Sequence, residues 1–431
     1  MKKSLSTFVF SYLLFASLLS QDACDLVSLT PIHDCITTVK DIQYGVGKQD
    51  YGFPDVSTGC APQLPLFMDV YQPCENAIAP RPLVIFIHGG AFAYGNKSDM
   101  AGLCDAFARR GYVAATISYR LSMNLLSLSR TNLIRAGARA LQDARCAVRY
   151  FKAHADSLGI DTTNIMVTGY SAGAVTALNM VFTNDPEERP VECDYLPSCG
   201  EWFGCPNCPD LGDLEGTGGW QSHTSGIRAA ASLAGAVMDL NLMDDYDKTP
   251  VFMVHGTADE TVAYDSACFL DLVPCPKLYG SHVIQQQAES LGLCTSLHTI
   301  PSGTHDMAPH QELIIAGVAD FFKKTICQDD PCLASGSVES EKPAPLLVFP
   351  NPAGDFLQVN FAEKTNAPQV GGQLLLADLT GRQLRSQATE PGAEAAVFSL
   401  EGLPQGFYFL NWKSEEGSVG TPVKRTVPPG P

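Results

Sequence analysis

Between residues 82 and 327 the sequence alternates short apolar runs with longer segments of helical periodicity. The strand-like runs cover residues 82–87, 112–118, 164–168, 229–237, 250–254 and 297–300, and the helical patterns include 135–155 and 312–325. Strands that are apolar on both faces and separated by helices predict a mostly parallel sheet with helices on both sides. Residues 38–45 and 66–71 predict an antiparallel edge before it. The expected fold class is α/β.

Composition excludes two broad classes of protein. The chain has 431 residues, of which 45% are hydrophobic and 17% are charged, and its formal net charge is −18. Such a chain buries a large core, so global disorder is excluded. Nucleic-acid affinity comes mostly from Lys and Arg neutralising phosphates, so this acidic balance excludes nucleic acid as the main partner.

The first twenty residues have the composition of a secretory signal peptide. Lys2 and Lys3 precede an apolar run over residues 8–19, shorter than the roughly 18 residues that a transmembrane helix needs. We predict a signal peptide over residues 1–20, with cleavage near Ser20–Gln21, and no transmembrane span elsewhere. The mature chain is expected to be exported.

The 15 cysteines agree with export, because exported proteins commonly contain disulfides. Short loops suggest the pairs Cys24–Cys35, Cys60–Cys74 and Cys268–Cys275, although spacing alone does not fix connectivity. The odd count leaves an unpaired thiol, and Cys146, within a helical pattern, is the predicted buried one. A cluster of four cysteines has spacings that suit disulfides or a zinc site, the former being favoured in an exported protein. Its members are Cys193, Cys199, Cys205 and Cys208.

A polar segment over residues 328–345 has the composition of a linker, and short alternating strands over residues 346–431 predict a small all-β sandwich. Four motifs mark this tail: Phe-Pro-Asn-Pro from Phe349, Asp-x-x-Gly-Arg from Asp378, Leu-Pro-x-Gly-x-Tyr from Leu403, and the pair Lys424-Arg425. The tail resembles the C-terminal sorting domain of type IX secretion. This resemblance implies that the secretion machinery is a partner and that the protein is released or displayed at the cell surface. A carbohydrate-binding or adhesion sandwich is the alternative.

A nucleophile motif follows one of the predicted strands. Gly169-Tyr170-Ser171-Ala172-Gly173 lies between the strand-like run at 164–168 and a helical segment at 174–182. GxSxG alone is a weak signal, and a tight packing turn is the alternative. Between strand and helix, however, its glycines permit a sharp turn that exposes the Ser171 hydroxyl at a helix N-terminus. Ser171 is therefore the predicted nucleophile.

A second motif, His88-Gly89-Gly90-Ala91-Phe92, directly follows the strand-like run at 82–87. Its glycines let backbone N–H groups approach a developing oxyanion. We predict an oxyanion hole formed by the N–H groups of Gly89, Gly90 or Ala91 together with that of Ala172. A plain glycine-rich turn is the alternative.

A carboxylate and a histidine complete the pattern. Asp259 lies in the loop Val254-His255-Gly256-Thr257-Ala258-Asp259 after another strand, with Glu260 and Asp265 as rival acids. The chain order Ser, Asp, His requires a later histidine. His282, His298 and His310 fall in predicted helices or a strand, whereas His305 lies in a loop after the last strand. His305 is therefore the predicted general base.

Taken together, these motifs resemble the α/β-hydrolase superfamily, specifically carboxylesterase and lipase-like members with an HGG oxyanion loop, over residues 60–327 within a predicted catalytic domain at 21–327. The resemblance implies a serine esterase in which Ser171 attacks an ester, His305 transfers protons and Asp259 orients the imidazole, with no metal or organic cofactor. A peptidase of the prolyl-oligopeptidase type and a non-catalytic binding module are the alternatives.

An acidic, cysteine-rich insertion over residues 184–222 is the expected source of substrate selection. An insertion after the nucleophile helix often forms a lid, so we predict a disulfide-stapled lid whose negative charge disfavours anionic substrates. For an exported enzyme, acetyl or feruloyl esters of polysaccharides are plausible substrates, as are other short acyl esters.

Overall fold

The computed structural model describes residues 23–48, 63–75, 80–125, 129–197, 208–269, 277–329, 332, 347–349, 354–360, 372–377, 383–390, 395–404, 406–414 and 417–425. The chain separates into two compact units, Met1–Gly336 and Ser337–Pro431. The predicted signal peptide and its predicted cleavage site lie outside the described residues. No helix within the described ranges is long and apolar enough to cross a membrane.

The first unit is built on an eight-stranded sheet with the order β1-β2-β4-β3-β5-β6-β8-β11. Its strands are β1 (Ile36–Lys48), β2 (Gln63–Pro73), β3 (Arg81–Ile87), β4 (Val113–Ile117), β5 (Ile160–Tyr170), β6 (Ala229–Leu233), β8 (Val251–Gly256) and β11 (Thr295–Ile300). β1 and β2 form an antiparallel edge, and β4 through β11 run parallel. The predicted α/β fold is confirmed.

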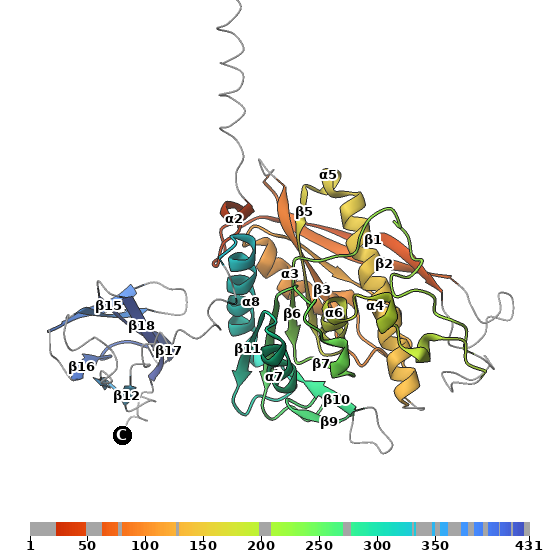
Figure 1. Cartoon of the computed structure of the whole chain (residues 1–431). Helices are drawn as coiled ribbons and strands as arrows, with labels where there is room; N and C mark the ends of the chain where they lie inside the picture. The colour runs from red at the N-terminus through yellow and green to blue at the C-terminus, as the bar shows by residue number, and fades with distance from the viewer. Residues whose placement is uncertain are drawn as a thin grey trace, which may run out of the picture. The chain divides into compact units, whose positions relative to one another are not determined.

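Helices cover both faces of this sheet (Figure 1). α3 (Ala101–Ala108) and α8 (Gln311–Ile326) pack on one face, and α4 (Arg130–Ala153), α6 (Ala172–Phe182) and α7 (Ser281–Leu291) pack on the other. Every residue of α6 is buried, because this helix lies between the sheet and α4. Shorter helical segments are α2 (Ala23–Leu26), α5 (Ala155–Leu158), η1 (Lys97–Met100), η2 (Pro186–Glu188), η3 (Val191–Cys193), η4 (Leu240–Leu242) and η6 (Ala308–His310).

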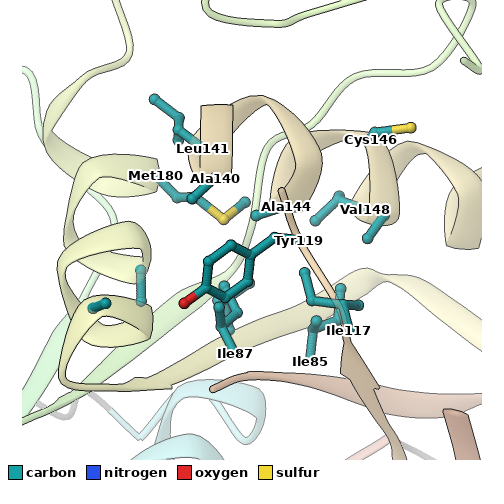
Figure 2. Packing of buried hydrophobic residues seen from close by; sticks show 14 of the residues in the cluster. Ile85, Ile87, Ile117, Tyr119, Ala140, Leu141, Ala144, Cys146, Val148 and Met180 are labelled. Carbon is teal, nitrogen blue, oxygen red and sulfur yellow. The ribbon is translucent and has the colours of Figure 1, made fainter. Parts of the chain in front are cut away.

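The core beneath α4 is mostly aliphatic. Ile85, Ile87 and Ile117 rise from the sheet toward Ala140, Ala144 and Val148 of α4 (Figure 2). Small alanines on α4 allow the helix to approach the branched side chains of the strands closely, and such close packing is what excludes water from the core. Cys146, the predicted buried thiol, is a buried free cysteine in this layer.

The single run predicted over residues 229–237 is two strands in the structure. Ala234 has a φ of 54°, which breaks the run into β6 and β7 (Ala236–Val237). β7 joins a small sheet with β10 (Lys277–Gly280) and β9 (Ser266–Cys268). Apolar composition could not reveal this break, because residues on both sides of it are fully buried.

The second unit is all-β. β12 (Leu347–Phe349), β13 (Phe356–Asn360) and β16 (Ala395–Ser399) form one sheet. β15 (Gln383–Thr389), β14 (Gly372–Ala377), β17 (Gly406–Ser414) and β18 (Gly417–Arg425) form the other. All pairs are antiparallel. Its small core includes Leu357, Leu374, Phe398 and Leu410. The motif at Asp378 and most of the segment 328–345 lie outside the described residues.

Two of the three predicted disulfides are wrong. Cys24 pairs with Cys327 and Cys35 pairs with Cys74, and a further bond joins Cys294 to Cys332. Short sequence separation misled the prediction, because the packing of α2 beside α8 brings residues 303 positions apart to a Cα–Cα distance of 4.9 Å. Cys268 is disulfide-bonded, but Cys275, its predicted partner, lies outside the described residues.

The Cys24–Cys327 bond ties α2 to the end of α8 and closes most of the first unit into one loop. Long loops lose the most chain entropy in the unfolded state when they are closed. We expect the double variant Cys24→Ser/Cys327→Ser to lower the free energy of unfolding by about 2–5 kcal/mol. Urea denaturation of the oxidised proteins measures this difference. Equal unfolding midpoints would show that the bond contributes nothing to the stability.

The insertion over residues 184–222 does not form the predicted lid in its described part. Arg135 of α4 donates hydrogen bonds to the carbonyls of Glu192 and Pro209, and Gln142 donates to those of Leu211 and Asp213. The insertion is therefore held along α4. None of its described residues lines the cavity beside Ser171.

The two described cysteines of the four-cysteine cluster differ in their bonding. Cys208 is disulfide-bonded, whereas Cys193 is a buried free thiol whose pKa is raised by burial to about 11. Because a disulfide sulfur is not a thiolate ligand, Cys208 is unavailable to a four-thiolate zinc site. Cys199 and Cys205 lie outside the described residues.

Candidate active site

Ser171 lies on a sharp turn between β5 and α6. Its φ of 54° and ψ of −118° are unusual for a non-glycine residue, and α6 begins at the next residue, Ala172. The Ser171 N–H donates to Leu233 O at 2.9 Å, which anchors the turn to β6. A Cβ on Gly173 would lie 2.1 Å from Ile87 O, so only glycine allows α6 to approach β3 this closely. The GxSxG spacing thus has a direct steric cause.

The structure brings Ser171, His305 and Asp259 together in one hydrogen-bonded chain. His305 Nε2 is 2.9 Å from Ser171 Oγ, and His305 Nδ1 is 2.7 Å from Asp259 Oδ2. The three residues come from the turn after β5 and the loops after β8 and β11, at the carboxyl edge of the parallel strands. His282 pairs with Asp265, and His298 and His310 belong to β11 and η6. Glu260 is exposed.

Asp259 is buried and richly hydrogen-bonded. Its Oδ1 accepts the backbone N–H groups of Thr261 and Val262 at 2.9 and 2.8 Å. Burial alone would raise the pKa of this carboxyl, but hydrogen bonds from His255, His305 and Val262 hold its pKa well below its usual range. Asp259 is therefore an anion across the whole neutral range, which is the state that orients and stabilises an imidazolium.

A second histidine, which the sequence motifs did not predict to belong to the site, lies beside this acid. His255 is fully buried, and its Nε2 is 2.9 Å from Val262 O and 3.3 Å from Asp259 Oδ2. A carbonyl oxygen only accepts, so Nε2 carries the hydrogen and directs it between Val262 O and the carboxylate. Nδ1 is 2.8 Å from the Ser281 hydroxyl. In the sequence, the one indication of this role is the position of His255, four residues before Asp259 and at the end of a buried strand.

Backbone hydrogen bonds join the loop that carries the acid to the loop that carries the base. Thr257 N–H donates to Ile300 O at 3.0 Å, and Ala258 N–H donates to Gly303 O at 2.8 Å. Tyr170, the residue before the nucleophile, donates its hydroxyl to His305 O at 2.8 Å. Burial raises the pKa of Tyr170 to about 12, so the hydroxyl keeps its proton. The loop that carries His305 is therefore held by the acid loop on one side and by Tyr170 on the other.

Tyr170→Phe is expected to lower kcat/KM by about fivefold to tenfold, because one neutral hydrogen bond contributes roughly 1 kcal/mol. Steady-state hydrolysis of a p-nitrophenyl ester measures the change. Tyr246→Phe, at a side chain that is 80% exposed, is the control and should leave the rate unchanged. An unaltered rate in Tyr170→Phe would show that the loop after β11 needs no such anchor.

The predicted oxyanion residues surround the serine. Gly89, Gly90, Ala91 and Ala172 all line the same cavity as Ser171. Gly90 has a φ of +110°, and Ala91 has a φ of 52°, a backbone region that favours glycine. Within the part of the chain that the structure describes, nothing accepts a hydrogen bond from the backbone N–H of Ala91 or Ala172. These two donors are available to a ligand in the cavity.

The side chains of His88 and Tyr119 support the loop that carries Gly89 and Gly90. The His88 ring stacks on Tyr119 with centroids 4.4 Å apart, and its Nδ1 lies 2.7 Å from Gly89 O. Tyr119 donates its hydroxyl to His88 O at 3.0 Å. Burial lowers the pKa of His88, although its hydrogen bond to Gly89 opposes this. His88 thus shapes the loop and lies outside the Ser171 hydrogen-bonded chain.

A cavity of about 540 Å³ opens beside Ser171 and His305. Most of its wall is apolar, with Phe92, Val175 and Phe269 among the lining side chains. Asp99 is the one lining residue with a permanent charge among those the structure describes. The cavity therefore suits an uncharged ligand of moderate size next to a nucleophile.

Two family models match the chain. Residues 68–200 match the BD-FAE family, and residues 347–423 match the secretion system C-terminal sorting domain. The predicted resemblances to an α/β-hydrolase esterase and to a sorting domain are confirmed. The sorting domain indicates secretion or display at the cell surface.

Several curated relatives each match less than a third of the chain. A neuroligin-like protein, glit-1, of Caenorhabditis elegans is 30% identical over 26% of this chain and 15% of its own length. Juvenile hormone esterase of Heliothis virescens is 32% identical over 22% of this chain and 17% of its own length. Esterase LipC of Mycobacterium tuberculosis is 28% identical over 28% of each chain. The chain thus spans less than a third of the length of these relatives.

Solved structures also resemble the chain at low identity. Esterase 2 of Thermogutta terrifontis, phosphorylated by paraoxon, is 20% identical with a TM-score of 0.44, covering 65% of this chain and 94% of its own. A truncated carbohydrate esterase from gut microbiota is 19% identical with a TM-score of 0.45, covering 69% of this chain and 99% of its own. The α/β fold is assigned from the strand order of the eight-stranded sheet.

Proposed function

Because the chain carries a BD-FAE domain, an α/β-hydrolase esterase domain, together with a secretion system C-terminal sorting domain, we propose that it is an exported serine hydrolase of carboxylic esters. The observation that carries the proposal is the chain of hydrogen bonds from Ser171 through His305 to Asp259, with distances of 2.9 and 2.7 Å. Type IX secretion machinery is the proposed partner in export.

The mechanism is a two-step acyl transfer. Ser171 Oγ attacks the ester carbonyl carbon while His305 Nε2 takes the hydroxyl proton, and the buried Asp259 anion stabilises the imidazolium. The N–H of Ala172 and those of the Gly89–Ala91 loop donate to the tetrahedral oxyanion. His305 then gives its proton to the departing alcohol. Water, deprotonated by His305, hydrolyses the acyl-enzyme and restores Ser171.

The cavity limits the substrate class. An acetyl group would fill only a small part of its volume of about 540 Å³, whereas a feruloyl group has the size that such apolar pockets enclose. Asp99 in the wall and the excess of acidic side chains in the insertion disfavour anionic substrates. Feruloyl or other bulky neutral esters of polysaccharides are the proposed substrates, with acetyl and short acyl esters as the alternative.

The test is a comparison of esters and peptides with the full chain produced in an oxidising host. We expect the enzyme to hydrolyse methyl ferulate with a higher kcat/KM than p-nitrophenyl acetate. We expect no cleavage of a Gly-Pro p-nitroanilide. Preference for acetate would move the substrate class to short acyl esters. Cleavage of the anilide alone would replace the proposal by a prolyl-oligopeptidase-type activity. A folded protein that is inert on all three would indicate a binding module.

A further inference from the structure

A second cavity of about 500 Å³ lies beside α4 and α6, apart from the one that contains Ser171. The insertion held along α4 forms one wall, including Arg189 and Pro190, and the segment that includes Asp239 and Leu242 forms another. Among the described lining residues, Met238 alone belongs to both cavities. The side chain of Met238 therefore separates the second cavity from the Ser171 cavity.

α6 presents one face to both cavities. Val175 lines the Ser171 cavity, and Asn179 and Thr183, spaced four residues apart on the same face, line the second cavity. Asn179 is 8% exposed and Thr183 is 3% exposed. No described residue forms a hydrogen bond with the Asn179 amide or with the Thr183 hydroxyl, and only their backbone groups are paired.

The polar groups of both side chains therefore face the second cavity, where solvent or a ligand can satisfy them. Several of the charged residues nearby are engaged with other groups. Arg189 pairs with Asp194 and Asp210, and Arg130 pairs with Glu192. Glu188 accepts the backbone N–H groups of Asn184 and Asp185. The amide and hydroxyl thus face the cavity as free donors and acceptors.

The remaining wall sets the chemistry of an occupant. Its floor is aliphatic, with side chains from α4, η4 and neighbouring loops: Ile134, Ala138, Leu141, Leu214, Met238 and Leu242. Among the described lining residues, its rim has the carboxylates of Glu187, Glu188, Glu192 and Asp239 and the guanidinium groups of Arg130 and Arg189. This balance disfavours anions, while an amide and a hydroxyl suit a ligand that both donates and accepts hydrogen bonds.

We propose that this second cavity is a binding site for a neutral hydroxylated ligand, such as a saccharide of one or two units, held by Asn179 and Thr183 over the aliphatic floor. A cavity of this volume encloses ligands of that size. The site is separate from the proposed hydrolysis at Ser171, and its occupancy does not depend on whether the chain is an esterase.

The test uses the full chain with Ser171→Ala and methyl-labelled methionine. The chain has 10 methionines, so its methyl spectrum is simple, and Met238→Leu assigns the reporter signal. We expect xylobiose or cellobiose to shift the Met238 signal with saturation, and glucuronate to have no such effect. Asn179→Leu and Thr183→Val should each weaken binding by about fivefold to tenfold. Their thermal unfolding should be nearly unchanged, because neither side chain forms a hydrogen bond with a described residue.

Thr295→Val is the matched control, because it also removes a buried unpartnered hydroxyl but lies outside both cavities. It should bind the saccharide as tightly as the parent chain. Absence of a saturable shift with either saccharide would overturn the proposal. A shift that survives the double variant Asn179→Leu/Thr183→Val would place the saccharide beside Ser171 instead. In a chain with Ser171 intact, the double variant should retain hydrolysis of p-nitrophenyl acetate.

Discussion

Ser171→Ala is expected to lower kcat for p-nitrophenyl esters by about 10⁴- to 10⁶-fold, since removing the nucleophile leaves only substrate binding and oxyanion donors. The KM should change little, because alanine leaves the cavity wall intact. Stopped assays at high enzyme concentration measure the residual rate. Thermal unfolding should be nearly unaffected, because alanine carries the same Cβ as serine at the strained φ of 54°.

Covalent labelling supplies the control for this variant. A fluorophosphonate probe should add one adduct to the parent chain, at Ser171, and none to Ser171→Ala, as measured by intact mass. A serine outside the hydrogen-bonded chain, such as Ser98 in the short helix η1, should not react in either protein. A variant that keeps more than about a tenth of the parent rate would be incompatible with the acyl-enzyme mechanism.

Asp259→Asn is expected to lower kcat by about 10⁴-fold at neutral pH while the chain stays folded. The amide cannot supply the negative charge that stabilises an imidazolium. It also presents N–H groups to a cluster in which His255, His305 and two backbone N–H groups already donate. The histidine would then adopt the wrong tautomer. Steady-state kinetics over a range of pH measures the loss.

The dependence of activity on pH distinguishes loss of the Asp259 charge from simple unfolding of the variant. The pKa of Asp259 is held well below its usual range, so the parent enzyme should show no loss of activity from protonation of this carboxyl until far into the acid range. The hydrogen bonds that stabilise this anion contribute stability above the unfolded pKa of about 3.9, and this contribution is lost as pH falls through the folded value. The free energy of unfolding of Asp259→Asn should therefore lack the part of its pH dependence that comes from ionisation of this carboxyl.

Glu260→Gln and Asp265→Asn are the matched controls for the acid. Both carboxylates are exposed, and Asp265 pairs with His282 instead of His305. Each variant should retain the parent kcat within about twofold, since exposed charges contribute little. If either variant loses as much activity as Asp259→Asn, the assignment of the acid is wrong.

Local patterns were sufficient to predict the fold, and they singled out the three residues that the structure joins in one hydrogen-bonded chain. The apolar runs predicted the parallel sheet because strands buried on both faces require apolar side chains at every position. The motif at Ser171 is recognisable because a Cβ on Gly173 would lie 2.1 Å from Ile87 O, so no side chain is permitted there. His305 was identified by elimination, since its rivals lie in regular elements, and the structure places its Nε2 2.9 Å from Ser171 Oγ.

Only the tertiary structure decided features that depend on distant segments meeting. Cys24 finds Cys327 instead of Cys35, because α2 packs beside α8. The described part of the insertion lies along α4 instead of covering Ser171, because Arg135 and Gln142 bind its carbonyls. No local pattern records such contacts. The same holds for His255 beside Asp259, and for Asn179 and Thr183, whose lack of partners exists only once the cavity around them has closed.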